Sequence, residues 1–251
     1  MNREATGLAG VRHIAYETLG STNAEALALA RAGERGPLWI SARTQSAGRG
    51  RRGSHWVSPS GNLHATLLLS EPSPPAQAPQ LSFVAGLAVH DAIAACAPQL
   101  GPDLKVKWPN DLLVGKAKVA GILIEGESGP VFAVAIGVGV NCGAHPDNTA
   151  YPAADLAGVG ALVVPDALLR ELAAAMSRRL AQWDGGRGFA ATRADWLKRA
   201  AGLGETLQVK LSERELSGRF QGLDEAGRLL LEQSGGVTAV TAGEVFGFGG
   251  S

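Results

Sequence analysis

The hydrophobic positions between about residue 37 and residue 140 fall mostly into short runs that polar turns separate, which is typical of β-strands. Longer stretches rich in Ala and Leu lie among these runs and are typical of helices. The first helix opens on Thr22-Asn23-Ala24-Glu25, the spacing of a capping box. We predict strands over 37–44, 63–69, 104–108, 112–114, 119–125 and 131–140, and helices over 22–31, 80–97, 166–183 and 189–200.

The pattern changes after about residue 202. From Glu205 onward the chain has short β segments joined by polar turns, as at 224–227 and 234–236. The sequence therefore predicts an α+β protein with two domains. Residues 1–202 form a mixed β-sheet with helices packed on it, and residues 203–251 form a small β-barrel.

Composition excludes several classes of protein. The 251 residues carry 23 basic and 23 acidic side chains, so no overall positive field favours DNA or an anionic membrane. Cys96 and Cys142 lack CxxC spacing and the five histidines form no metal-spaced pair, so we expect no disulfide framework and no structural metal. We find no signal peptide and no uncharged apolar run of about 18 residues. We expect a cytoplasmic protein with no membrane segment.

The loop at 48–53 carries the pattern G-x-G-x-x-G after a strand, which by itself suggests dinucleotide binding. That interpretation needs a helix to begin at the loop, and Pro59 and Gly61 oppose one. The loop instead presents three arginines within four positions, and Gln45 and Trp56 flank it. Arginine is a forked, permanently charged donor for carboxylates and phosphates. We interpret the loop as an ordered anion site; the alternative is a solvated basic turn.

A second group of candidate residues follows the strand that Pro109 ends. Asn110 and Asp111 form a polar turn whose side chains can cap or bind. Lys118 enters an otherwise apolar strand, so we expect its stem to be half buried. Its ammonium would face negative charge that develops on a phosphate or acyl oxygen. The alternative is an edge-strand lysine that discourages aggregation.

The strand at 131–140 has glycine at two alternate positions, Gly137 and Gly139, which therefore share one face. Such a face usually packs against a helix or a flat ligand. Asn141 follows at the strand end, where it can bind a ligand or shape a turn. No GxxxxGK[ST] motif is present, so any ATP site must be of another kind.

Five segments, taken together and in this order, resemble the biotin–protein ligase family. Each motif alone is weak, whereas the ordered set is highly specific and covers the chain from about residue 14 to its end. The segments are Gly20–Asn23, Gln45–Gly53, Lys107–Asp111, Lys118–Ile122 and Gly137–Asn141.

The resemblance implies two sets of site residues. The residues implied for biotin are Ser21, Thr22, Asn23, Gln45, Gly48, Arg49, Gly50, Arg51, Lys118, Gly121, Gly137 and Gly139. The residues implied for ATP are Arg49, Arg51, Trp56, Asn110, Asp111, Lys118 and Asn141. Lys118 and Arg51 are the implied catalytic residues. Magnesium would arrive with the ATP phosphates, and Asp111 is a candidate ligand for it.

The resemblance also implies a catalytic domain like that of class II synthetases and an SH3-like C-terminal domain. The implied reaction joins biotin to AMP, releases pyrophosphate, and passes biotin to a lysine of a biotin carboxyl carrier protein. That carrier belongs to acetyl-CoA carboxylase or another biotin-dependent carboxylase. About 20 residues precede Ser21, too few for the helix-turn-helix domain that some members carry, so we expect the ligase-only form and no DNA binding. A homodimer is left open.

Three alternatives remain open at the level of the sequence. A related ligase or transferase could act on lipoate or octanoate, although Gln45 and the arginine-rich loop favour biotin. In a non-enzymatic biotin sensor or storage protein, Lys118 and the ATP-side residues would have no function. A nucleic-acid-binding module is disfavoured by the zero net charge.

Overall fold

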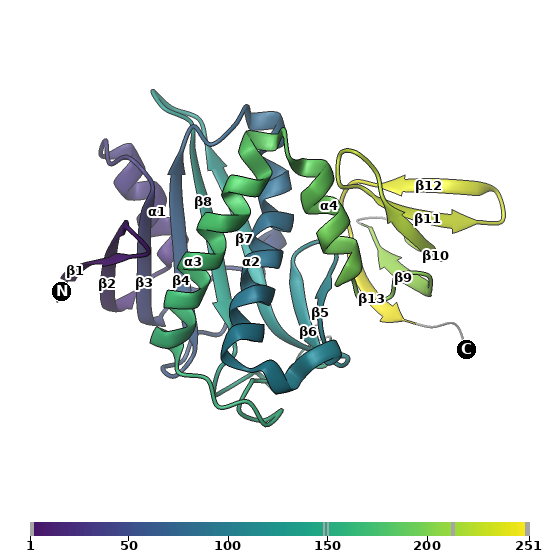
Figure 1. Ribbon diagram of the computed structural model, residues 1–251, viewed down its shortest axis with the longest axis horizontal. Coiled ribbons are helices and arrows are strands. Elements are labelled where there is room, and N and C mark those ends of the chain that lie inside the picture. Colours follow the sequence, from purple (N-terminus) through teal and green to yellow (C-terminus); the bar gives the residue numbers. More distant parts are fainter. Residues whose placement is uncertain (1–2, 148, 150, 212–213, 249–251) are drawn as a thin grey trace.

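Figure 1 shows the fold in the computed structural model, which describes residues 3–147, 149, 151–211 and 214–248. In this part of the chain, eight strands form one mixed sheet in the order β1-β2-β3-β4-β8-β7-β6-β5. β2 and β3 are parallel, and every other neighbouring pair is antiparallel. The strands are β1 (Arg3–Leu8), β2 (Val11–Leu19), β3 (Leu38–Gln45), β4 (Leu63–Ser70), β5 (Leu104–Lys107), β6 (Asp111–Val114), β7 (Ala117–Glu127) and β8 (Ala133–Val140).

Helices cover both faces of this sheet. α1 (Thr22–Arg31) packs on one face beside β3, β4 and β8. α2 (Leu81–Cys96) and α3 (Pro165–Trp183) lie on the other face, in front of the sheet in Figure 1, and α4 (Phe189–Lys198) follows them. Short 3₁₀ turns are η1 (Arg51–Gly53), η2 (Pro75–Gln80), η3 (Pro98–Asp103) and η4 (Asp184–Gly186).

The strand β8 shows how the sequence divides the two faces. Ile136 and Val138 are buried in the larger core, together with residues of α2 and α3. Ala135 belongs to the smaller core under α1. Because side chains alternate along a strand, Gly137 and Gly139 lie on the α1 face as well. The prediction that these two glycines share one face is confirmed.

The helix α2 is apolar on nearly every side because it packs on the sheet and also against α3 and α4. Leu81, Leu87 and Ile93 are fully buried. The segment Pro75–Cys96 has the length and hydropathy that a membrane-spanning helix would need, and more than half of its most apolar stretch is buried inside the fold. Its composition is thus explained by its central position.

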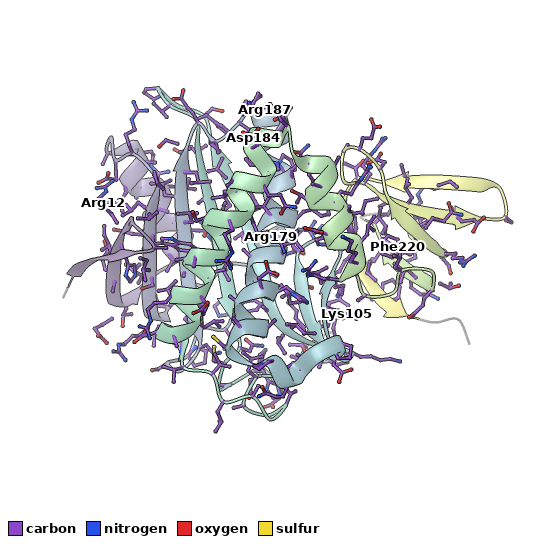
Figure 2. The ribbon with its side chains drawn as sticks, in the orientation of Figure 1. Arg12, Lys105, Arg179, Asp184, Arg187 and Phe220 are labelled. Carbon is purple, nitrogen blue, oxygen red and sulfur yellow. The ribbon has the colours of Figure 1, made fainter. Side chains whose placement is uncertain are left out.

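Polar side chains join the three helices of this layer. Arg179 of α3, labelled in Figure 2, donates from Nε to Asp91 of α2 (2.7 Å) and from Nη1 to Asp195 of α4 (2.8 Å). Burial alone would raise the pKa of Asp91, but the adjacent His90 and the hydrogen bond and charge of Arg179 lower it to about 2. A hydrogen bond from Gln182, opposed by burial and aided by Arg179, lowers the pKa of Asp195 to about 2. Both carboxylates therefore stabilise the helix layer in their charged form.

The described residues after 202 form a separate five-stranded antiparallel sheet in the order β12-β11-β10-β9-β13, consistent with an SH3-like fold. Its strands are β9 (Thr206–Lys210), β10 (Glu215–Leu223), β11 (Leu229–Gln233), β12 (Gly236–Val240) and β13 (Glu244–Phe248). The buried Trp108 donates from Nε1 to Gly227 O (3.2 Å), and the ring of Phe83 packs on the same glycine. This sheet is therefore docked on the larger one rather than tethered beside it.

The start of the chain differs from the prediction at the N-cap of α1 and in the residues before it. The N-cap of α1 is Ser21, whose side chain accepts from Ala24 N, and Thr22 is the first helical residue. The predicted capping box is therefore wrong by one residue, and Glu25 accepts a hydrogen bond from the Tyr16 hydroxyl (2.7 Å) instead. The residues before Thr22, for which no element was predicted, form β1 and β2.

Candidate functional site

A cleft of about 650 Å³ opens on the α1 face of the large sheet. The start of α1, the strands β7 and β8 and the loop after β3 surround it, and Gly243, Glu244 and Val245 of the C-terminal sheet close one side. Gly48 lies outside the lining and packs against Trp56 and Ser58. The predicted residues that line the cleft are Ser21, Thr22, Asn23, Gln45, Arg49, Gly50, Arg51, Trp56, Asn110, Asp111, Lys118, Gly121, Gly137, Gly139 and Asn141.

One end of the cleft is uncharged and polar. Gln45 Oε1 accepts from Thr22 N (2.8 Å), and Gln45 Nε2 donates to Ser58 Oγ (2.8 Å). Asn23 Oδ1 accepts from Thr66 Oγ1 (2.6 Å), and Thr66 is fully buried. Amides and hydroxyls held by their neighbours in this way offer donors and acceptors in fixed directions. This end suits a neutral group that both donates and accepts hydrogen bonds.

The middle of the cleft is a slot floored by glycine. A Cβ on Gly139 would lie 2.5 Å from the Trp56 indole, and one on Gly121 would lie 3.0 Å from the same ring. A Cβ on Gly137 would overlap Asn23. The Trp56 Nε1 group is buried, with no hydrogen-bond partner in the described part of the chain. The missing side chains therefore let the flat Trp56 ring lie directly on the strand backbone, and a flat ligand against these glycines stays a prediction.

The other end of the cleft is cationic. Lys118 Nζ lies 2.6 Å from Asp111 Oδ1, and Lys107 Nζ lies 3.5 Å from Asp111 Oδ2. Lys107 is buried beneath the ring of Tyr151, 4.7 Å from its centroid. Burial lowers the pKa of Lys107, and the charge of Asp111 acts against that shift. Two ammonium groups held by one carboxylate can stabilise negative charge that develops between them.

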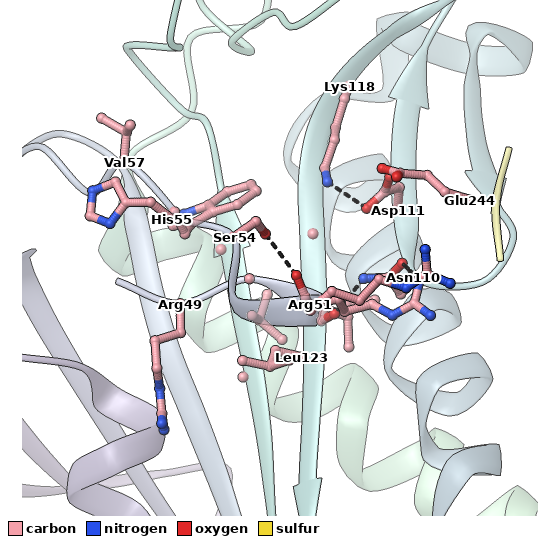
Figure 3. A pocket seen from close by; sticks show the side chains of 18 of the residues that line it. Arg49, Arg51, Ser54, His55, Val57, Asn110, Asp111, Lys118, Leu123 and Glu244 are labelled. Atoms are coloured by element: carbon pink, nitrogen blue, oxygen red, sulfur yellow. Dashed lines mark hydrogen bonds and ion pairs between the residues drawn. The ribbon is translucent and has the colours of Figure 1, made fainter. Parts of the chain in front are cut away.

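The arginine loop connects these ends. Figure 3 shows Arg49 and Arg51 leaving the loop in different directions. Arg51 donates to Asn110 Oδ1 (3.2 Å) and to Gly243 O (3.4 Å), so the loop is joined to both sheets. Burial lowers the pKa of Arg51, and the neighbouring charge of Arg52 lowers it further. Arg49 pairs with Glu125 on β7 (3.0 Å). The loop contains the short turn η1 and no α-helix, so rejecting a dinucleotide fold here was correct.

Asn141 holds the segment that follows β8. Its Nδ2 donates to Ala154 O (3.0 Å), and its backbone N donates to Val119 O (2.8 Å). Pro146, Thr149, Tyr151 and Ala153, which follow β8, thereby line the cleft. Asn141 borders the cleft mainly as a structural anchor, and its predicted contact with ATP stays a prediction.

Sequence reasoning missed several residues of this site. Lys107 begins the Lys107–Asp111 segment already singled out, although no role was assigned to it, and Glu125 is an acidic residue in an apolar strand, so both had a local signal. Tyr151 and Glu244 had none, because their hydrogen bond joins an irregular segment to the C-terminal sheet. Among the described residues, no three His, Cys, Asp or Glu side chains gather to hold a metal ion.

Comparison with known proteins identifies the family. Residues 21–141 match the biotin/lipoate A/B protein ligase family, and residues 202–246 match the biotin protein ligase C-terminal domain. A biotin–[acetyl-CoA-carboxylase] ligase of Paracoccus denitrificans is 47% identical over 239 residues, which cover 92% of this chain and 98% of the relative. The bifunctional ligase/repressor BirA of Escherichia coli K12 is 33% identical over 81% of this chain and 64% of its own length.

A solved structure has the same architecture. The biotin protein ligase from Aquifex aeolicus, in complex with biotin and ATP, superposes with a TM-score of 0.80 and 26% identity. The match covers 93% of this chain and 97% of that one. The fold and the cleft thus define a ligase of the class that acts on biotin or lipoate. Within that class, the chain belongs to the biotin–protein ligase family.

Proposed function

We infer that the protein is a biotin–protein ligase, which activates biotin with ATP and transfers it to a lysine of a carrier protein. The observation that carries this inference is a single cleft with three parts in line. The polar end at Thr22 and Gln45 suits the ureido group, the glycine slot suits flat rings, and the lysine pair suits a carboxylate beside a phosphate. Relatives named for this activity match nearly the whole chain.

The reaction needs no enzyme nucleophile. A carboxylate oxygen of biotin attacks the α-phosphorus of ATP, the bond to the bridging oxygen breaks, and pyrophosphate leaves. The amine of the carrier lysine then attacks the acyl carbon of biotinyl-5′-AMP, AMP leaves, and the nitrogen loses a proton. Lys118 and Lys107 flank the site where the negative charge of the first step develops. Catalysis rests on positioning and charge stabilisation.

The individual contacts stay proposals. We assign the ureido end to Ser21, Thr22, Asn23 and Gln45 and the carboxylate to Lys118. We assign the nucleotide to Arg51, Asn110 and the exposed face of Trp56. An aromatic ring beside a glycine floor is well suited to stack a base. Burial raises the pKa of Tyr151, as does its hydrogen bond to Glu244, so the hydroxyl stays a donor at the nucleotide end.

Magnesium is proposed to reach the cleft with the ATP phosphates, where it would neutralise their charge and align them. Asp111 is the candidate ligand, and Glu244 is a second carboxylate at that end of the cleft. The carboxylate of Asp111 is already paired with Lys107 and Lys118, so the protein supplies at most a partial ligand set. The residues present fit an ion held chiefly by phosphate oxygens.

The remaining proposals concern partners and location. The substrate protein is the biotin carboxyl carrier protein of acetyl-CoA carboxylase or of a related carboxylase. We propose a cytoplasmic protein that does not bind DNA; both of its cysteines are free thiols, and its net charge is zero. We propose the domain division after residue 202, which the change from helix to β-sheet at that point supports. No oligomeric state is assigned.

One experiment tests the activity. The protein is incubated with ATP, biotin and a biotin carboxyl carrier domain, and the mass of the carrier is read by mass spectrometry. We expect one biotinyl group on one lysine, together with AMP and pyrophosphate. Parallel reactions contain lipoate or octanoate in place of biotin. Transfer of either acid at a comparable rate would support the lipoate-type alternative, and biotin binding without pyrophosphate release would indicate a sensor.

A further inference from the structure

Glu125 lies at the polar end of the cleft and does not line it. It stands in β7, paired with Ala135 of β8, and its side chain is 27% exposed. One oxygen, Oε2, accepts two hydrogen bonds: from Asn23 Nδ2 at 2.8 Å and from Arg49 Nη2 at 3.0 Å. A single carboxylate thus joins the first turn of α1 to the arginine loop.

The bond to Asn23 fixes the direction of a buried amide. Asn23 is 3% exposed, and its Nδ2 also donates to Leu123 O (3.2 Å). Its Oδ1 accepts from Thr66 and packs against the backbone of Gly137. With both N–H groups used on the β7 side, Asn23 presents to the cleft only the remaining acceptor site of Oδ1. Without Glu125 one N–H would lose its partner, and the amide would be free to turn.

The bond to Arg49 fixes the loop at its other end. Arg51 ties the loop to Asn110 and Gly243 at the nucleotide end, whereas Arg49 points away from that end, toward α1. An exposed ion pair contributes little by itself. Here the carboxylate also accepts from a buried amide, so one oxygen of Glu125 both holds the loop closed and orients Asn23.

We propose that Glu125 is a positioning residue for biotin capture, which couples closure of the arginine loop to the orientation of Asn23. The proposal rests on the inferred biotin–protein ligase function. Glu125 acts through two other side chains and touches no reacting atom. It should therefore govern the affinity for biotin and the stability of the closed loop, and it should leave the chemical step unaffected.

The test compares two variants at this position with a matched control. Glu125→Ala removes both hydrogen bonds, whereas Glu125→Gln keeps one acceptor oxygen and loses the charge. Glu127→Ala is the control, because Glu127 follows two residues later in β7 and also bridges to α1, through Arg31 at 2.6 Å, outside the cleft. Biotin affinity is measured by titration calorimetry without ATP. Loop closure is measured as the rate of tryptic cleavage after Arg49, Arg51 and Arg52.

We expect Glu125→Ala to raise the Kd and KM for biotin about tenfold, the scale of one lost hydrogen bond to a charged group. The KM for ATP should stay within about twofold of the wild-type value, and so should kcat at saturating biotin. Tryptic cleavage of the loop should become several times faster. Glu125→Gln should restore part of the biotin affinity and little of the loop protection, and Glu127→Ala should match wild type.

Each other outcome is decisive. If both Glu125 variants bind biotin as tightly as Glu127→Ala does, Glu125 is not a positioning residue. An equal loss of ATP affinity would show general disruption of the cleft and would also overturn the proposal. If Glu125→Ala unfolds, the isosteric Glu125→Gln decides by the same criteria. If wild-type protein binds no biotin, the proposed function fails instead, which calorimetry on the wild type reveals before any variant is compared.

Discussion

Asp111 holds two lysines on its two carboxylate oxygens, Lys118 at 2.6 Å and Lys107 at 3.5 Å. Asp111 and Lys107 are buried, and Lys118 is partly exposed toward the cleft. Because Asp111 neutralises part of their charge, the lysines can be kept close together without a bound anion. A phosphate or carboxylate that enters the cleft meets preorganised cations, and such a site costs little reorganisation during the reaction.

This arrangement predicts a large loss of activity for Lys118→Ala. Pyrophosphate exchange should fall about 100-fold or more, the scale for one charge-stabilising donor. Lys116→Ala is the matched control, because Lys116 is an exposed lysine in the turn before β7. Near-normal exchange by a folded Lys118→Ala protein would remove this lysine from the mechanism.

A second prediction concerns the glycine slot. Gly139→Ala would place a methyl group 2.5 Å from the Trp56 indole, so the ring would have to leave the floor of the slot. Formation of biotinyl-5′-AMP, measured as kcat/KM, should fall at least tenfold, or roughly 1.4 kcal/mol. The free energy of unfolding should change by only about 1 kcal/mol, because alanine also favours the strand.

Gly235→Ala is the matched control for the slot. No atom lies within 4 Å of the position its Cβ would take, so neither activity nor stability should change. The measurements are urea denaturation and adenylate formation on the same preparations. Wild-type kinetics for Gly139→Ala would mean that adenylate formation does not depend on the position of Trp56 on the floor of the slot.

The contrast between what the sequence predicted and what it missed has a physical basis. Glycine alternation in β8 and the cluster at Asn110–Asp111 are local patterns, and they placed the floor and one end of the cleft. Ser21 was passed over as the N-cap because Thr22, unlike Ser21, has an acidic residue three positions later. Tyr151 and Glu244 meet only after the C-terminal sheet docks, and no local spacing encodes that contact.

A third prediction concerns stability against acid, far from the cleft. The pKa values of Asp91 and Asp195 are lowered to about 2 in the folded protein. The two ionised carboxylates therefore stabilise the fold fully above their ordinary pKa near 4, and this stabilisation is lost as the pH falls toward 2. Arg179→Met removes a partner shared by both carboxylates. The variant should be less stable than wild type at pH 7, and the difference should shrink between about pH 4 and pH 2.

Urea denaturation at pH 7, 4 and 3 measures this difference. Arg187→Met is the control, because the pair between Arg187 and Asp184, also labelled in Figure 2, is largely exposed and should contribute little at any pH. A difference between Arg179→Met and wild type that is independent of pH would assign the role of Arg179 to packing rather than charge.

The last prediction concerns the arginine loop as a lid. Fixing its glycine-rich backbone costs roughly 1–2 kcal/mol of conformational entropy per residue. In the structure Arg51 offsets part of this cost through its bonds to Asn110 and Gly243, and bound adenylate would add anionic contacts. Arg51→Gly removes that anchor and adds chain freedom. It should raise the dissociation rate of biotinyl-5′-AMP more than it slows adenylate synthesis.

Released adenylate reacts with exposed amines, so bystander proteins mixed with Arg51→Gly, ATP and biotin should become biotinylated on surface lysines. Arg52→Gly is the matched control, because it makes the same chemical change at the next residue. The backbone of Arg52 has a φ of 55°, which glycine adopts without strain.

Bystander labelling is read by mass spectrometry, and loop closure by tryptic cleavage with and without ligand. If Arg51→Gly and Arg52→Gly release adenylate equally, chain freedom rather than the Arg51 anchor governs the lid. If neither variant differs from wild type in labelling or cleavage, the loop does not act as a lid.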